Sequence, residues 1–314
     1  MAHIPLICRT ATTFTAGQAL DEDALAEFLC RFVDAGLGVY LASGGSGEGH
    51  ALTPPEIRRV YDIGVSVGKG KVPVNANPPE QHTPRAMIEQ AEIAIAAGVD
   101  VINIYGPTVL HGYRPTPAEI TAYFDEVLAS VAAPVAIAPN PVMGYTPAAR
   151  VMADVADRHH QVVAINLSGL GNGYFVELMD ALSRDVPVYV PLDGSLYTLP
   201  LGAAGLLGAE ANIIPRTVRR YIDLHQGDPA ELAASYADLL RFATFARQWY
   251  GATPRWIKLA MRVLGLPGGS GGLRAPYRMP SQEVIDQFSA GLLALGIPEI
   301  DELAAAARSA PAGS

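Results

Sequence analysis

Short apolar segments alternate with helical segments along this 314-residue chain as far as His225. Eight of the apolar segments are predicted to be strands: Ile4–Cys8, Gly38–Ala42, Val72–Asn75, Val99–Tyr105, Pro134–Ala138, Val162–Leu167, Val186–Leu192 and Gly205–Ala209. Each precedes a segment with helical character: Asp21–Ala35, Pro54–Val67, Pro84–Ala97, Pro117–Ser130, Pro147–Arg158, Tyr174–Ser183, Leu196–Ala203 and Pro215–His225. Eight consecutive strand–helix pairs predict a (β/α)8 TIM barrel. A doubly wound open sheet would also alternate, but it usually has fewer strands.

The pattern changes after His225. Four further helical segments are predicted, separated in part by the glycine-rich turn region 266–272: Pro229–Tyr250, Pro254–Leu264, Ser281–Leu295 and Pro298–Arg308. We therefore expect a barrel over residues 1–226 and a C-terminal helical extension over residues 227–314, and no second catalytic domain.

Local signals support these helix limits. Four helices are predicted to begin at a proline, which suits the first helical position because its missing N–H has no intrahelical partner there: Pro54, Pro84, Pro117 and Pro147. Thr53 and Glu56 form a capping-box pattern ahead of the second helix. Three helices are predicted to end at Ala-Gly pairs, with glycine in the left-handed conformation: Gly36, Gly98 and Gly205.

Composition excludes several classes of partner. The net charge of −9 and the pI near 5.2 argue against nucleic acid, since phosphate binding needs clustered Lys and Arg. No apolar run reaches the roughly 18 residues that a membrane span needs. The N-terminal residues lack a signal-peptide pattern, and the two cysteines, Cys8 and Cys30, lack metal-ligand spacing. We expect a cytoplasmic protein that contacts neither nucleic acid nor membrane.

A glycine-rich turn follows the second predicted strand, in the sequence Ser43-Gly44-Gly45-Ser46-Gly47-Glu48. Its backbone amides carry no bulky side chains above them and can approach an anion closely, with two serine hydroxyls beside them. A tight strand-to-helix turn with no ligand is the alternative.

The motif resembles the Gly-Thr-Thr-Gly-Glu signature of the dihydrodipicolinate synthase / N-acetylneuraminate lyase family. Further matches span nearly the whole chain: Ala76–Asn77, Arg114-Pro115-Thr116, Asn140-Pro141, Leu201-Gly202 and the region Thr253–Pro280, which includes Lys258 and Arg274. The resemblance implies a (β/α)8 barrel with a C-terminal helical region, assembled as a homodimer or homotetramer. It also implies 2-oxo acid chemistry on a lysine Schiff base, leading to aldol addition, cleavage or dehydration.

The residues that this chemistry needs are absent at the matching positions. The family lysine ends the sixth strand, where this chain has Asn166, and the relay tyrosine ends the fifth, where it has Ala138. The following arginine falls near Met143. Of the two carboxylate-binding threonines, one is replaced by Gly45 and the other by Ser46, which keeps a hydroxyl.

No other lysine is expected to replace the missing one. The chain has three lysines, and Lys69 and Lys71 precede the third strand, at the end of the barrel opposite the usual active site. Lys258 matches a helical, structural lysine of the family. Because an asparagine amide has no basic lone pair to add to a carbonyl, the sequence predicts chemistry without a Schiff base.

Polar residues nevertheless gather at the predicted strand ends. For proton transfer the candidates are His111, Tyr113, His50 and Tyr105. For substrate binding they are Ser43, Gly45, Ser46, Asn75, Asn77, Asn140, Asn166, Ser168, Asp193 and Glu210, with Asn103 also at the rim. The alternatives are that about half of the asparagines cap helices, that the histidines are surface loop residues, and that the tyrosines only pack.

Three hypotheses follow. The first is a lyase that acts on a small carboxylate or sugar-derived substrate without an imine and without a cofactor. The second is a non-catalytic descendant that binds a small molecule. The third is a lyase in which Asp193 and Glu210, together with a histidine, hold a divalent metal, although their spacing matches no known ligand motif.

Overall fold

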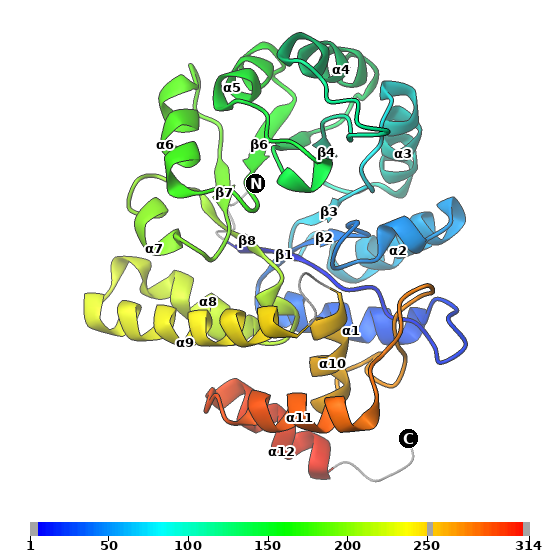
Figure 1. Ribbon diagram of the computed structural model, residues 1–314, viewed down its shortest axis with the longest axis vertical. Helices are drawn as coiled ribbons and strands as arrows, with labels where there is room; N and C mark the ends of the chain where they lie inside the picture. The colour runs from blue at the N-terminus through cyan, green and yellow to red at the C-terminus, as the bar shows by residue number, and fades with distance from the viewer. Residues whose placement is uncertain (1–5, 250–253, 310–314) are drawn as a thin grey trace.

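The computed structural model describes residues 6–249 and 254–309, so the parts of the expected ranges at 1–5, 250–253 and 310–314 lie outside it. Eight parallel strands form a closed barrel in the order β1 to β8 (Figure 1). The strands are β1 Leu6–Arg9, β2 Gly38–Leu41, β3 Val74–Ala76, β4 Ile102–Tyr105, β5 Val135–Ala138, β6 Val162–Asn166, β7 Val188–Val190 and β8 Gly205–Gly208. The predicted TIM barrel is confirmed.

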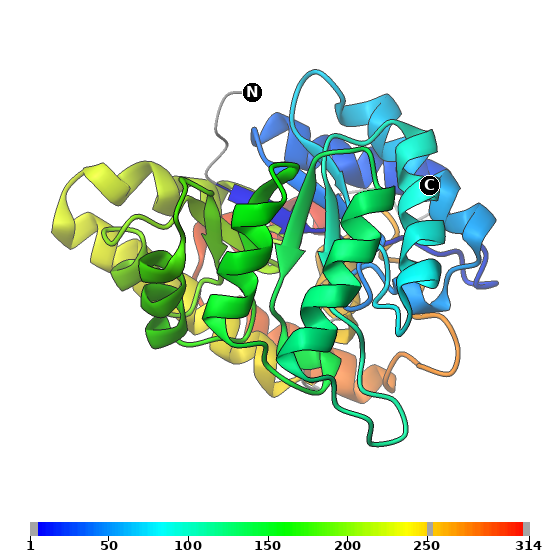
Figure 2. The same ribbon diagram turned by 90° about the horizontal axis from the view of Figure 1, so that it is seen from above.

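A helix follows each strand and covers the outside of the barrel (Figures 1 and 2). The helices are α1 Glu22–Asp34, α2 Pro54–Gly68, α3 Pro84–Ala97, α4 Pro117–Ser130, α5 Ala149–Arg158, α6 Asn172–Ala181, α7 Ser195–Thr198 and α8 Pro215–Asp223. Short 3-10 turns, η1 Gly49–Ala51, η2 Pro141–Met143, η3 Glu210–Asn212 and η4 Leu224–Gln226, occupy the loops. The apolar faces of the helices and the outward side chains of the strands form one continuous core between the two layers.

The helix signals are confirmed at most ends. The backbone N–H of Thr53 donates to Glu56 at 2.9 Å, as the capping box predicts, and Gly98 closes α3 with φ of +79°. Two of the predicted proline and glycine signals, Pro147 and Gly205, do not mark helix ends. Helix α5 begins at Ala149 rather than at a proline, and Gly205 opens β8, because Gly202, with φ of +102°, already provides the left-handed residue after α7.

The C-terminal extension consists of α9 Pro229–Gln248, α10 Arg255–Val263, α11 Gln282–Leu293 and α12 Pro298–Ser309. Figure 1 shows these helices gathered on one side of the barrel, next to α8 and α1. No helix of the described residues is long and apolar enough to cross a membrane.

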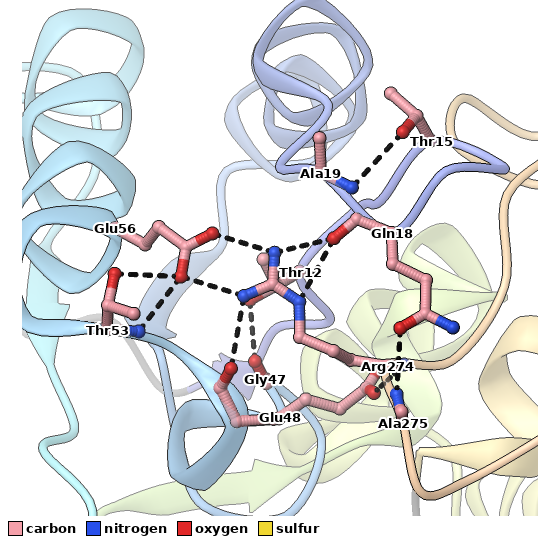
Figure 3. Close-up of polar contacts among 11 residues, drawn as sticks. Thr12, Thr15, Gln18, Ala19, Gly47, Glu48, Thr53, Glu56, Arg274 and Ala275 are labelled. Atoms are coloured by element: carbon pink, nitrogen blue, oxygen red, sulfur yellow. Dashed lines mark hydrogen bonds and ion pairs between the residues drawn. The ribbon is translucent and has the colours of Figure 1, made fainter.

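Arg274, in the segment between α10 and α11, ties this extension to the barrel (Figure 3). Its guanidinium binds both carboxylate oxygens of Glu56 at 2.7 Å and the carbonyl oxygens of Gln18 and Ala51, and lies 4.4 Å from the ring centroid of Phe14. Planar bidentate pairing of this kind is the geometry in which arginine binds carboxylates most strongly. Arg274 therefore fixes two parts of the barrel to the C-terminal region: the start of α2, through Glu56, and the loop after β1, through Gln18 and Phe14.

Candidate functional site

A polar layer crosses the interior of the barrel near the carboxyl ends of the strands. Strand register places Arg9 beside Tyr40 and Tyr40 beside Asn75, so these three residues of β1, β2 and β3 face the same way. Tyr40 belongs to the small apolar cluster inside the barrel, which makes that direction inward. By the same reasoning Asn103, beside Ala136, and Asn166, beside Tyr189, also point inward.

Hydrogen bonds across the barrel confirm that this layer fills its centre. The Asn166 amide nitrogen donates to the Tyr40 hydroxyl at 3.0 Å and to Asn103 Oδ1 at 2.8 Å. Strands β2 and β6 lie on opposite sides of the closed barrel, so the first bond spans its diameter. Arg9 Nη1 donates to Ser168 Oγ at 3.1 Å, from β1 to the loop after β6.

Five buried side-chain atoms of this layer have no hydrogen-bond partner among the described residues. They are Arg9 Nε, Arg9 Nη2, Asn75 Oδ1, Asn103 Nδ2 and Asn166 Oδ1. Each buried polar atom left unpaired costs on the order of 1–3 kcal/mol, so a native protein gathers several of them only where something else binds them. Three donors and two acceptors thus converge inside the barrel, and one of the groups carries a positive charge.

Tyr40 adds a further donor. Its oxygen accepts the Asn166 bond, which leaves its own proton available. Burial raises the pKa of this phenol well above its usual value of 10, although the Asn166 hydrogen bond opposes the shift. The hydroxyl is therefore protonated at neutral pH and suited to donate to a developing oxyanion.

Tyr105 and Asn77 lie closer to the mouth, above the polar layer. The Tyr105 hydroxyl and the Asn77 amide are 3.3 Å apart, and both residues are buried. Tyr105 is also the register neighbour of Ala138, the residue at the expected tyrosine position. A hydroxyl is thus supplied beside Ala138 from the adjacent strand.

The glycine-rich loop brings two titratable groups to the mouth. The carboxylate of Glu80, in the loop after β3, lies so close to Gly44 that a Cβ built there would be 2.7 Å from Glu80 Oε2. The ring of His50 is held by a 2.7 Å hydrogen bond between Nδ1 and the Gly44 carbonyl oxygen. Burial raises the pKa of Glu80, while the positive charges of Arg9 and His50 lower it. Elsewhere in the loop, Ser43 Oγ accepts from the backbone of Gly47, which fixes the turn.

Three predicted candidates, Asn140, Tyr113 and His111, lie away from the polar layer. Asn140 caps η2 by accepting from the Val142 backbone, which is the capping role left open above. Tyr113 is half exposed and donates to Glu119 at the start of α4. His111 is exposed, with φ of +50°, in the same long loop between β4 and α4, which projects from the barrel in Figure 2. Within the described chain, no hydrogen bond brings His111 or Tyr113 to the polar layer.

Asp193 and Glu210 each contact other groups, although burial and, to a smaller extent, the charge of Asp193 raise the pKa of Glu210. Asp193 is exposed and pairs with Arg247 of α9 at 2.6 Å. Glu210 is directed outside the barrel, where it lies with Leu6 and Val218 between β8 and α8 and its charge interacts with Cys8. Residues 6–249 and 254–309 contain no group of three or more His, Cys, Asp or Glu placed to hold a metal ion. These side chains therefore offer no support for the metal hypothesis.

The three lysines all bind other groups outside the barrel interior. Lys69 contacts the Gly98 carbonyl oxygen and Lys71 the Val67 carbonyl oxygen, both at the amino ends of the strands. Lys258 of α10 is buried, donates to the Thr12 carbonyl oxygen and lies 3.6 Å from Glu48 Oε1. Burial lowers the pKa of Lys258 to about 8, although Glu48 opposes the shift.

A cavity of about 1040 Å³ opens at the amino ends of the strands, on the far side of the polar layer. Tyr40 and Asn75 line its inner end, and residues that precede strands, such as Pro73, Pro134 and Pro187, line its opening. The polar layer therefore lies between this cavity and the mouth of the barrel.

Comparison with known proteins identifies the family. The model of the "Dihydrodipicolinate synthetase family" matches residues 5–294. The chain belongs to this family. Among curated relatives, the 4-hydroxy-tetrahydrodipicolinate synthase of Methanospirillum hungatei is 25% identical over 279 residues, which cover 86% of this chain and 90% of the relative. A probable 5-dehydro-4-deoxyglucarate dehydratase of Bradyrhizobium diazoefficiens is 27% identical over 306 residues, covering 92% and 90%.

Solved structures agree on the fold. The dihydrodipicolinate synthase of Cyanidioschyzon merolae, with lysine bound, superposes with a TM-score of 0.84 at 21% identity and covers 94% of this chain and 98% of that one. A prophage protein of the dihydrodipicolinic acid synthase family from E. coli, in complex with pyruvate, gives 0.83 at 22% identity and covers 94% and 99%. The dihydrodipicolinate synthetase family contains synthases and dehydratases, and this chain is accordingly a member of a lyase family.

Three residues of the site were missed from the sequence. Arg9 ends β1, and only the β1–β2 register shows that it points inward; a charged residue closing an apolar strand was the available signal. Tyr40 was assigned to the apolar strand interior. Glu80 follows two prolines in the loop after β3, and nothing local indicates that it folds onto Gly44.

Proposed function

We propose that this chain is a lyase of the dihydrodipicolinate synthetase family that acts on a small carboxylate without a lysine Schiff base. The reaction is an aldol-type cleavage or a dehydration of a carboxylate or sugar-derived substrate. The observation that carries the proposal is the polar layer itself: the Arg9 guanidinium keeps two unpaired donors and binds Ser168, two residues beyond Asn166, the residue that we assign to the family's lysine position.

In this proposal Arg9 binds the substrate carboxylate through Nε and Nη2, because the guanidinium fork matches a carboxylate geometrically. The free amide atoms of Asn75, Asn103 and Asn166 bind hydroxyl or carbonyl groups of the substrate. Tyr40 then donates to the carbonyl oxygen as negative charge develops on it. Hydrogen-bond donors that are in place before the reaction thus stabilise the negative charge, which an imine would do in a Schiff-base enzyme.

The comparisons support a substrate of this class. One relative is named as a dehydratase of 5-dehydro-4-deoxyglucarate, and one similar structure holds pyruvate. Both compounds are small oxo acids whose carboxylate would suit Arg9.

Borohydride trapping tests the chemistry. Incubating the protein with pyruvate and sodium borohydride should give no mass adduct. Calorimetry tests the role of Arg9: the protein should bind pyruvate, and Arg9→Met should weaken this binding at least tenfold. Arg85→Met is the matched control, because Arg85 is exposed and pairs only with Glu89 on the surface of α3. A stable adduct on any lysine would refute the proposal. Binding without turnover of any sugar acid would favour the non-catalytic hypothesis.

We further propose that the protein assembles as a homodimer or homotetramer in the cytoplasm. Two large apolar side chains near α7, Tyr197 and Leu201, are 65% and 57% exposed, and Leu110 in the β4–α4 loop is 51% exposed. Such exposed groups mark contact surfaces when they cluster. Light scattering after size-exclusion chromatography should give two or four times 33.1 kDa.

A further inference from the structure

The Glu80 carboxylate lies beside the glycine-rich loop at the barrel mouth, where burial raises its pKa and a hydrogen bond from its own backbone N–H opposes this rise. Glu80 lies in the loop after β3, beyond Asn75 and Asn77, and it is partly buried, with its carboxylate against Gly44 of the neighbouring loop. Other acidic groups at this end of the barrel are already used. Glu48 accepts from the Arg274 backbone and faces Lys258, Glu119 caps α4, and Glu56 binds Arg274.

The charges around Glu80 come from two different elements. Burial has the larger effect on the pKa of Glu80 and raises it, whereas the charges of Arg9, on β1, and His50, on η1, both lower it. His50 is anchored to the carbonyl oxygen of the same glycine against which Glu80 lies. A carboxylate and an imidazole therefore both lie against Gly44, in the loop that follows β2.

We propose that Glu80 is the residue that removes and returns the proton during the reaction in this site. The inference rests on the proposed function. With the substrate carboxylate on Arg9, the Glu80 carboxylate takes a proton from the carbon next to the substrate carbonyl. The C–H electron pair moves into the enolate, whose oxygen the Tyr40 hydroxyl binds. Glu80 then gives the same proton to the hydroxyl on the next carbon, the C–O bond breaks, and water leaves.

Substrate binding prepares Glu80 for this task. In the free protein the guanidinium of Arg9 favours the ionised carboxylate. A bound substrate carboxylate neutralises that guanidinium and adds its own negative charge, so the pKa of Glu80 rises on binding and the carboxylate becomes a stronger base. Between the pKa of Glu80 in the free protein and its higher pKa in the complex, binding therefore takes up a proton and affinity falls as pH rises, by up to tenfold per pH unit. Above that interval Glu80 stays ionised in the complex and is available as the base.

Pyruvate is the probe for this linkage. Titration calorimetry in two buffers of different ionisation enthalpy gives the number of protons taken up, and Glu80→Gln should reduce it to zero while keeping pyruvate binding at low pH. Glu89→Gln, on exposed α3, is the matched control and should behave as the wild type. Exchange of the pyruvate methyl protons with deuterium oxide, followed by NMR, should slow at least 100-fold in Glu80→Gln, although this variant should bind pyruvate at least as tightly as the wild type.

Gly44→Ala provides a second variant that keeps the carboxylate. Its Cβ would push Oε2 away from its present position, so exchange should slow although Glu80 is present. Proton uptake that persists in Glu80→Gln but disappears in His50→Asn would assign it to His50 and overturn the inference. Pyruvate binding that depends on Arg9 but takes up no proton at any pH across the range in which carboxyl groups titrate would also overturn it and leave the proposed function standing. Absence of any Arg9-dependent binding would overturn both.

Discussion

The ion pair between Glu56 and Arg274 allows a quantitative test of how the C-terminal region stabilises the barrel. The Arg274 hydrogen bonds, followed by those from Thr53, lower the pKa of Glu56 from 4.5 to about 2. At about 1.4 kcal/mol per pKa unit, this corresponds to about 3 kcal/mol of stability. The Glu56 side chain is 26% exposed, so solvent screening reduces the expected value to about 2 kcal/mol.

The perturbation is Glu56→Gln, which keeps the size and shape of the side chain and removes its charge. Because the folded-state pKa is depressed, the stabilisation is fully present above pH 4.5 and is lost as pH falls towards 2. We therefore expect the variant to be less stable than the wild type by about 2 kcal/mol at pH 7, with the difference shrinking steadily below pH 4.5.

Urea unfolding followed by circular dichroism at pH 7, 4 and 3 measures this difference. Glu89→Gln is the control, because Glu89 belongs to an exposed ion pair with Arg85 that should contribute less than about 1 kcal/mol. Equal unfolding midpoints for wild type and Glu56→Gln at pH 7, or a difference that does not change with pH, would refute the argument.

Two further variants test other parts of the structure. Asn166→Lys places an amine at the end of β6 beside the Tyr40 hydroxyl. This variant should give a borohydride-trapped pyruvate adduct that the wild type lacks. A folded variant that binds pyruvate without forming the adduct would show that position 166 does not face the substrate. Lys258→Met leaves Glu48 buried without its charge partner and should destabilise the fold by about 3–5 kcal/mol, and adding Glu48→Gln should restore part of that loss in the same urea assay. A double variant less stable than Lys258→Met would contradict the pairing.

The fold was predictable because the spacing of strands and helices is a local property. Proline at the start of α2, α3 and α4 and glycine at the end of α3 act within one helical turn, so their effect can be read from the sequence. The errors lie at short elements, such as α7, which the sequence extended to Ala203 and the structure ends at Thr198. Packing against neighbours, and not local preference, sets those limits.

The site was predictable only in part, because the direction of a side chain at a strand end depends on register. Asn75, Asn166 and Ser168 were expected at the rim and lie in or beside the polar layer. Glu210 was expected among them, yet it points outward, because β8 ends at Gly208 and η3 turns the chain before residue 210 reaches the mouth. Arg9 and Glu80 depend on contacts between strands or loops that no local pattern encodes.

The contacts of Lys258 and Arg274 have a consequence for how this protein can be divided. These two side chains provide the cations for Glu48 and Glu56 and cover Phe14, so a barrel cut after residue 226 would retain a buried carboxylate with no counter-charge and an uncovered ring. Barrel and extension should therefore melt in one cooperative transition. The shape of the entrance to the barrel is thus set partly by residues more than 200 positions further along the chain.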